Sequence, residues 1–174
     1  MQLTLERGDI TTVATDAIVN AANSSLLGGG GVDGAIHAAA GPRLLEACRE
    51  LRRSTLPDGL PVGEAVATPG FDLPAAWVIH TVGPNRHAGE TDPGLLSSCF
   101  TRSLDVAADL RARTVAFPAV SAGVYGWAPD DVARIALEAV RSWDEANPAA
   151  VDEVRFVLFN DSLLTSFQQA LAAV

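Results

Sequence analysis

Four consecutive glycines, Gly28–Gly31, are the feature that most constrains this chain. They follow an apolar run at residues 17–19 and two asparagines, and they precede Asp33, where a helix is expected to begin. An ordered run of glycine costs backbone entropy and offers no side-chain packing. Its presence therefore implies that another group, such as a ligand, comes very close to the backbone here. A flexible linker is the alternative, but this run is wedged between a buried strand and a helix start. At such a junction the usual ligand is a phosphate, held by loop N–H groups and the helix dipole.

The basic residues then exclude several kinds of phosphate chemistry. All 12 are arginine, and the chain contains no lysine. A Walker-type loop, which needs Gly-Lys-Ser/Thr after its glycines, is therefore excluded. Kinase-type pairing of lysine with phosphate and Schiff-base catalysis are excluded for the same reason. The glycines also do not form Gly-x-Gly-x-x-Gly with an acidic residue about 20 positions on, so a Rossmann site is disfavoured. Neutral backbone donors would instead hold a diphosphate that is recognised and not transferred.

Apolar runs alternate with segments of helical periodicity along the whole chain. Strands are predicted near Gln2–Glu6, Ala17–Asn20, Glu64–Thr68, Trp77–Val82, Thr114–Pro118 and Val154–Asn160. Helices are predicted near Gly34–Ala40, Arg43–Arg53, Pro93–Arg111, Pro129–Glu145 and Leu163–Ala172. This alternation indicates an α/β layer fold with a mostly parallel sheet. In such a sheet, ligands bind at the carboxyl ends of the strands, which is also where the glycines lie.

Length and composition predict one α/β domain over residues 1–174. A chain of 174 residues that is 48% hydrophobic can bury one sizeable core. No apolar stretch approaches the roughly 20 residues that span a bilayer, and no signal peptide is visible, so we expect a cytoplasmic protein without a membrane partner. Cys48 and Cys99 lie far apart, which suits two buried thiols in a reducing compartment. We also expect a monomer.

Charge and histidine spacing narrow the class of partner. The net charge of −9 argues against a broad nucleic-acid footprint. His37, His80 and His87 show no metal-ligand spacing with either cysteine, so the sequence predicts neither a metal site nor a metal cofactor. The polar and Gly/Pro-rich segments 54–63 and 84–94 are expected to be surface connections.

Two further motifs lie at the ends of predicted strands. Asp9, in Gly-Asp-Ile, can cap a turn; alternatively its carboxylate and the Ile10 N–H can pair with the exocyclic amine and a ring nitrogen of adenine. The segment 118–127, Pro-Ala-Val-Ser-Ala-Gly-Val-Tyr-Gly-Trp, carries two glycines around an aromatic residue. A plain strand–helix connector needs neither two glycines nor two aromatics, so we interpret this segment as a second loop that closes on a ligand.

Together these motifs resemble those of a known family. Gly-Asp-Ile-Thr at 8–11, the stretch 17–37 through Asn-Ala-Ala-Asn and the glycines, Trp-Val-Ile-His-Thr-Val-Gly-Pro at 77–84, and Phe-Pro-Ala-Val-Ser-Ala-Gly-Val-Tyr-Gly at 117–126 are similar to the signature of MacroD-type macrodomains. The resemblance spans nearly the whole chain in the right order. It implies a three-layer α/β/α sandwich with a mixed, mostly parallel central sheet and a cleft for ADP-ribose. It also implies an enzyme that removes mono-ADP-ribose from acidic side chains of modified proteins and deacetylates O-acetyl-ADP-ribose, with no cofactor.

The resemblance further implies roles for individual residues. Asn23 would bind the distal ribose, and Asp33 would orient or deprotonate the attacking water near the anomeric carbon. Ala122 and Trp127 depart from the Thr and Tyr that are frequent at these positions in the family, which bears on turnover and linkage preference. The ligand-binding residues implied are Asp9, Ile10, Asn20, Gly28, Gly29, Gly30, Gly31, Val32, Ser121, Ala122, Gly123, Val124, Tyr125, Phe159 and Asn160.

Alternatives to hydrolysis remain open at this point. Asp33 is the only carboxylate in the Gly-rich loop, but an aspartate before Gly34 can also act purely as a helix N-cap. His37 and His80 each lie among apolar residues, and we interpret both as core residues and not as bases. A module that binds ADP-ribose without turnover is the second candidate. A hydrolase of ADP-ribose 1″-phosphate or of ADP-ribosylated nucleic acid is the third.

Overall fold

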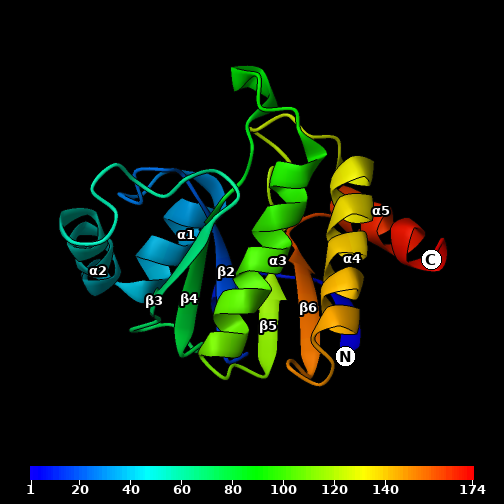
Figure 1. Ribbon diagram of the computed structural model, residues 1–174, viewed down its shortest axis with the longest axis horizontal. Helices are drawn as coiled ribbons and strands as arrows, with labels where there is room; N and C mark the ends of the chain where they lie inside the picture. Colours follow the sequence, from blue (N-terminus) through cyan, green and yellow to red (C-terminus); the bar gives the residue numbers. More distant parts are fainter.

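Six β-strands form one mixed sheet in this computed structural model, which describes all residues 1–174 (Figure 1). The strands lie in the order β1-β6-β5-β2-β4-β3. Their bounds are β1 (Gln2–Arg7), β2 (Ala17–Ala22), β3 (Ala65–Pro69), β4 (Trp77–Val82), β5 (Thr114–Phe117) and β6 (Glu153–Leu158). The helices are α1 (Gly31–Ala40), α2 (Pro42–Arg53), α3 (Pro93–Asp109), α4 (Pro129–Ala146) and α5 (Asp161–Ala172), with 3₁₀ turns η1 (Ile10–Thr12) and η2 (Arg86–Ala88).

Strand direction follows from the lengths of the connections. All neighbouring strands are parallel except β3 and β4, which pair antiparallel with Val66 opposite His80. Parallel neighbours need a crossover of about a dozen residues or more, and residues 70–76 are too few to provide one. The prediction of a mixed, mostly parallel sheet is confirmed.

Helices cover both faces of the sheet, as the three-layer prediction requires. On one face α3 and α4 cover the strands (Figure 1), and the ring of Phe167 of α5 packs at a tilt against that of Phe156 of β6, with ring centroids 4.9 Å apart. On the other face Ile36 of α1 and Leu44 of α2 enter a second core. Successive residues of β2 alternate between the two cores, with Val19 in the first and Ile18 in the second. The continuously apolar strands are therefore buried on both faces.

One helix begins earlier than predicted, and this corrects the N-cap interpretation of Asp33. Helix α1 starts at Gly31, its N-cap is Gly30, and no side chain caps it. Asp33 is the third residue of the helix and not its cap. The low helix propensity of glycine masks this start in the sequence. Every other helix and strand begins and ends within two residues of its predicted bounds.

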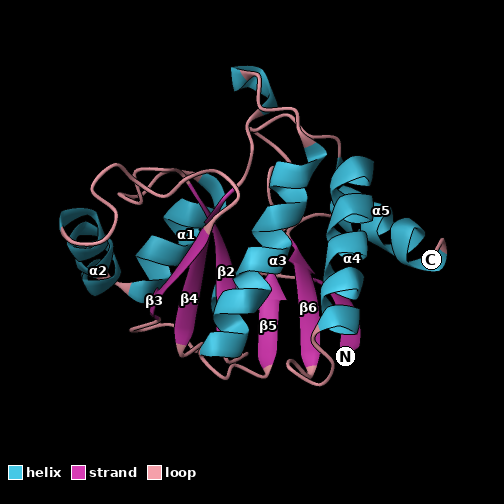
Figure 2. Ribbon diagram, in the orientation of Figure 1, coloured by secondary structure: helices cyan, strands magenta, loops and turns pink.

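The parallel strands bring the predicted motifs to one edge of the sheet. The loops after β1, β2, β4, β5 and β6 gather at the carboxyl ends of these strands, at the top of Figure 2. Cys48 and Cys99 are buried free thiols, as predicted. None of the helices combines the length and the apolar character that crossing a membrane would require.

Candidate active site

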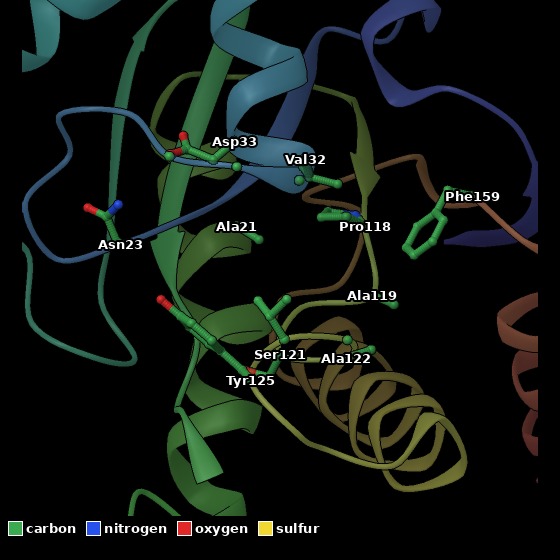
Figure 3. Close-up of a pocket in the computed structure, with 15 residues that line it drawn as sticks. Ala21, Asn23, Val32, Asp33, Pro118, Ala119, Ser121, Ala122, Tyr125 and Phe159 are labelled. Atoms are coloured by element: carbon green, nitrogen blue, oxygen red, sulfur yellow. The ribbon is translucent and has the colours of Figure 1, made fainter. Parts of the chain in front are cut away.

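A cleft of about 510 Å³ opens at the carboxyl ends of β2 and β5 (Figure 3). These neighbouring strands continue to opposite faces of the sheet, β2 to α1 and β5 to α4, and such a switch point is where open α/β sheets bind ligands. The lining residues are Ala21, Asn23, Gly29, Gly30, Gly31, Val32, Asp33, Pro118, Ala119, Ser121, Ala122, Gly123, Val124, Tyr125 and Phe159.

Strand order places the predicted residues along the length of the cleft. Asp33 and Asn23, after β2, lie at one end, with Tyr125 reaching in from the second loop; Phe159, after β6, lies at the other (Figure 3). Asp9 follows β1, and the N–H of Gly8 donates to the Leu158 carbonyl, so Asp9 lies beside the β6 end. The cleft thus extends from Asp33 to the neighbourhood of Phe159 and Asp9.

Asp33 presents two carboxylate oxygens with different surroundings. Its side chain is 7% exposed; Oδ1 accepts a hydrogen bond from Asn20 Nδ2 at 2.8 Å and lies 3.4 Å from His37 Nε2. Oδ2 points toward Gly29, where an added Cβ would come within 3.0 Å of it and 3.2 Å of Asn23 Nδ2. Oδ1 is therefore held by a buried hydrogen-bond donor, while Oδ2 faces the cleft beside the Asn23 amide.

The loop that carries Asn23 is held in shape by backbone contacts. Asn23 Nδ2 donates to the Gly28 carbonyl at 2.8 Å, which leaves one amide hydrogen for a ligand, and its Oδ1 accepts from the Ser25 N–H. The guanidinium of Arg52 donates to the carbonyl of Ser25 and also to carbonyls of the segment after α2. Leu60 N–H donates to the Ser24 carbonyl at 2.8 Å. Asn23 is thus presented from a fixed turn.

The segment Gly28–Gly31, called the Gly loop below, contacts helix α1 closely because its residues are glycines. Gly28 and Gly31 have φ of +93° and +58°, in the left-handed region where other residues are strained. A Cβ at Gly34 would lie 2.7 Å from the Gly29 carbonyl oxygen. The first N–H groups of a helix have no intrahelical partner, and no side chain caps α1. These donors and the positive end of the helix dipole form a ready site for an anion.

The second loop, residues 118–127, is supported from the segment after β4. Ser121 is buried at φ +68° and its Oγ donates to the Pro84 carbonyl at 2.9 Å. The N–H of Arg86 donates to the Tyr125 carbonyl, and its guanidinium lies 4.9 Å from the Trp127 ring centroid. The segment 84–94 is therefore more than a surface connection, because it holds this loop over the cleft.

Five predicted ligand-binding residues do not line the cleft. Asn20 is fully buried behind it, where its amide contacts Asp33, so the structure places it as a support and not as a wall of the cleft. Gly28 lines a neighbouring hollow. Asp9 is exposed and caps η1, because its carboxylate accepts a hydrogen bond from the Thr11 N–H. The interpretation of Asp9 as a turn cap is therefore confirmed. The remaining two are Ile10, which is buried beside Asp9, and Asn160, which caps α5.

Sequence reasoning missed some residues around the site. Ala21, Pro118 and Ala119 line the cleft. They lie within the motifs singled out in the sequence, at the ends of strands, but were not among the predicted ligand-binding residues. Of the two residues that depart from the family pattern, Ala122 lines the cleft, whereas Trp127 is buried in the core.

The interpretation of His37 as a core residue is wrong. Its side chain is 14% exposed, and it lines a hollow of about 450 Å³ next to the cleft, shared with Gly29. It lies one turn after Asp33 on α1, so the two side chains meet. The corresponding interpretation of His80 is confirmed, since this residue is 1% exposed inside β4.

The fold and the cleft define a three-layer α/β/α protein with a ligand-sized opening at its switch point. The sequence model of the Macro domain family matches residues 19–136, and the chain belongs to this family. It is 57% identical over 97% of its length to a macro domain-containing protein of Streptomyces nogalater, covering 91% of that protein. A macro domain-containing protein of Streptomyces coelicolor is also 57% identical, with 97% of this chain and 98% of that one covered.

Solved structures agree with this assignment. The Oceanobacillus iheyensis macrodomain with ADP superimposes with a TM-score of 0.92 at 43% identity, covering 97% of this chain and 89% of that one. The Trypanosoma brucei macrodomain in complex with ADP-ribose gives a TM-score of 0.88 at 39% identity, covering 98% of this chain and 69% of that one.

Proposed function

We propose that this protein binds ADP-ribose in the cleft between the Gly loop and the second loop. The diphosphate would accept hydrogen bonds from the N–H groups of Gly29–Gly31 and the start of α1, where no side chain competes for them. Adenine would lie between Phe159 and Asp9, whose Oδ1 is engaged with Thr11 and whose second oxygen is left to accept from the exocyclic amine. The distal ribose would then reach Asn23, Asp33 and Tyr125. Support comes from the solved relatives with ADP and ADP-ribose.

We further propose that the bound group is hydrolysed. The observation that carries this is Asp33, whose Oδ1 is held by Asn20 while Oδ2 faces the cleft beside the Asn23 amide. An oriented carboxylate at the distal ribose can accept a proton from water as that water attacks. An ester at the ribose already has a competent leaving group, so a positioned water and an oriented sugar suffice. A positioned base contributes about 10²–10⁴-fold.

The proposed substrates are esters of ADP-ribose. These are proteins mono-ADP-ribosylated on Asp or Glu side chains, and O-acetyl-ADP-ribose, as in MacroD-type enzymes. Water is consumed, the carboxylic acid leaves, and ADP-ribose is released. The residues named above would supply the binding contacts and the base, within a single domain over residues 1–174.

A panel of linkages tests the proposal. Purified protein is incubated separately with Asp/Glu-linked, Ser-linked and Arg-linked ADP-ribosyl proteins and with O-acetyl-ADP-ribose, and released ADP-ribose is measured by chromatography. We expect release from the Asp/Glu-linked protein and from O-acetyl-ADP-ribose. Release from none of the four, with ADP-ribose still bound in calorimetry, would make the protein a reader module. Absence of binding as well would refute the cleft assignment.

A further inference from the structure

A buried row of polar side chains leads from Asp33 away from the cleft. Asn20 Nδ2 lies 2.8 Å from Asp33 Oδ1 and 3.1 Å from Nδ1 of His80. On the other side of the imidazole ring, Nε2 lies 2.9 Å from Thr68 Oγ1. The four residues are each at most 5% exposed, and they come from α1, β2, β4 and β3. The row therefore connects the candidate catalytic carboxylate to the edge strand of the sheet.

The direction of every hydrogen bond in this row follows from Asp33. A carboxylate oxygen only accepts, so the group that Asn20 turns toward it must be the NH₂ and not the carbonyl. The second hydrogen of that NH₂ points at His80 Nδ1, which must then be the acceptor. The ring proton of a neutral His80 is thereby placed on Nε2, where Thr68 Oγ1 accepts it.

Two observations indicate that this arrangement serves position and not stability. Asn20 Oδ1 is buried and has no hydrogen-bond partner, a cost that a purely structural network would avoid. Burial, with a smaller contribution from the charge of His37, lowers the pKa of His80 to about 3. The ring is therefore neutral at working pH and keeps an acceptor at Nδ1. Cys48, whose Sγ lies 4.0 Å from Nε2, is the other titratable group in contact with the ring.

We propose that His80 is a positioning residue for the hydrolysis, fixing the Asn20 amide so that Asp33 holds Oδ1 inward and Oδ2 toward the cleft. This role rests on the proposed function. Thr68 acts one step further back, by selecting the tautomer of the ring. Neither residue lines the cleft, so their loss should affect the orientation of Asp33 and not the contacts that hold ADP-ribose.

Kinetics of matched variants test this role. His80→Leu removes the acceptor for Asn20, whereas His80→Asn restores one, because the asparagine Oδ1 can occupy the place of the ring Nδ1. We expect His80→Leu to lower kcat on the Asp/Glu-linked substrate by about 10- to 100-fold, with the Kd for ADP-ribose within about threefold of the parent. His80→Asn should recover most of the loss. Equal kcat in parent and His80→Leu, or a loss of kcat that only follows loss of ADP-ribose binding, would overturn the role.

The ring nitrogens give a readout independent of activity. In ¹⁵N spectra of the ¹⁵N-histidine-labelled parent, we expect one ring with protonated Nε2 and bare Nδ1 that does not titrate between pH 5 and 8. Thr68→Val should shift part of the proton to Nδ1 and lower kcat. A parent ring with the proton on Nδ1 overturns the proposal even if His80→Leu does not fold. If the parent hydrolyses nothing but shows the expected ring, the proposed function fails and the hydrogen-bond row stands.

Discussion

At the scale of single residues, the chemistry depends on how differently the two oxygens of Asp33 are placed. The N–H donor on Oδ1 comes from a fully buried asparagine, and the mostly buried His37 lies nearby. The opposite oxygen shares the space around Gly29 with the Asn23 amide. A flexible surface carboxylate would have to be ordered when the substrate binds, whereas this one is oriented beforehand. Behind Asp33, a second titratable residue, His80, is also buried.

Burial of His80 predicts that the stability of the protein falls in acid. Its pKa of about 3 in the folded state lies below the ordinary 6.5 of an unfolded chain. The unfolded state therefore binds the proton first, so stability from this group is complete above pH 6.5 and is lost as pH falls toward 3. Between pH 7 and pH 5 the loss from His80 alone is expected to be about 2 kcal/mol. Urea denaturation of parent and His80→Asn at both pH values measures it.

Comparison with His80→Asn separates the contribution of His80 to the pH dependence of stability from that of the carboxylates. Both proteins share every Asp and Glu, so only the parent should show the additional loss of stability at pH 5. Parallel loss in the two proteins would mean that His80 is not the buried neutral group that titrates on unfolding.

At the scale of elements, the Gly loop and helix α1 act together. Left-handed backbone at Gly28 and Gly31 lets the loop turn into the helix, and the missing Cβ of Gly34 lets the loop contact it. Gly30 differs from these, because its φ is −96° and an added Cβ meets nothing within 4 Å. A side chain at Gly30 therefore enters open space at the wall of the cleft without disturbing the fold.

Gly30→Glu is predicted to abolish ADP-ribose binding while the protein stays folded. The carboxylate would occupy the space of the diphosphate and repel its charge. Gly30→Ala is the matched control, which should retain binding and Tm. Calorimetry with ADP-ribose and thermal melts of parent and both variants check this. Parental affinity in Gly30→Glu would show that this loop does not hold the diphosphate.

The sequence predicted the elements well because hydrophobic periodicity is local. It also predicted most cleft residues, since Gly-rich loops after buried strands indicate that a ligand comes close to the backbone. The start of α1 at Gly31 was missed because the helix begins on glycines. The antiparallel β3 could have been foreseen from the short 70–76 connection. The Asn20–His80 contact could not, because residues 60 positions apart meet only through the pairing of β2 with β4.

At the scale of the whole molecule, strand order determines the order of the subsites. Reading across the sheet, β1 and β6 present Asp9 and Phe159, β5 presents the second loop, and β2 presents Asn23 and Asp33. A ligand as long as ADP-ribose can then contact four strand ends at once. The protein has a net charge of −9, so the phosphates of the ligand would be held mainly by backbone N–H groups and a helix N-terminus. Recognition of an anion by this acidic protein would thus be confined to the cleft.

The cleft is proposed to hydrolyse what it binds, with Asp33 acting on water. The most direct test of this claim is the initial rate of ADP-ribose release from an Asp/Glu-linked substrate at saturation, for parent and Asp33→Ala. We predict a loss of about 10²–10⁴-fold in Asp33→Ala. Binding of ADP-ribose should weaken much less, because the adenine and diphosphate sites lie elsewhere in the cleft. Melting temperatures control for the lost helix-dipole interaction of about 0.3–1 kcal/mol. A folded Asp33→Ala protein that releases ADP-ribose at the parental rate would contradict the claim.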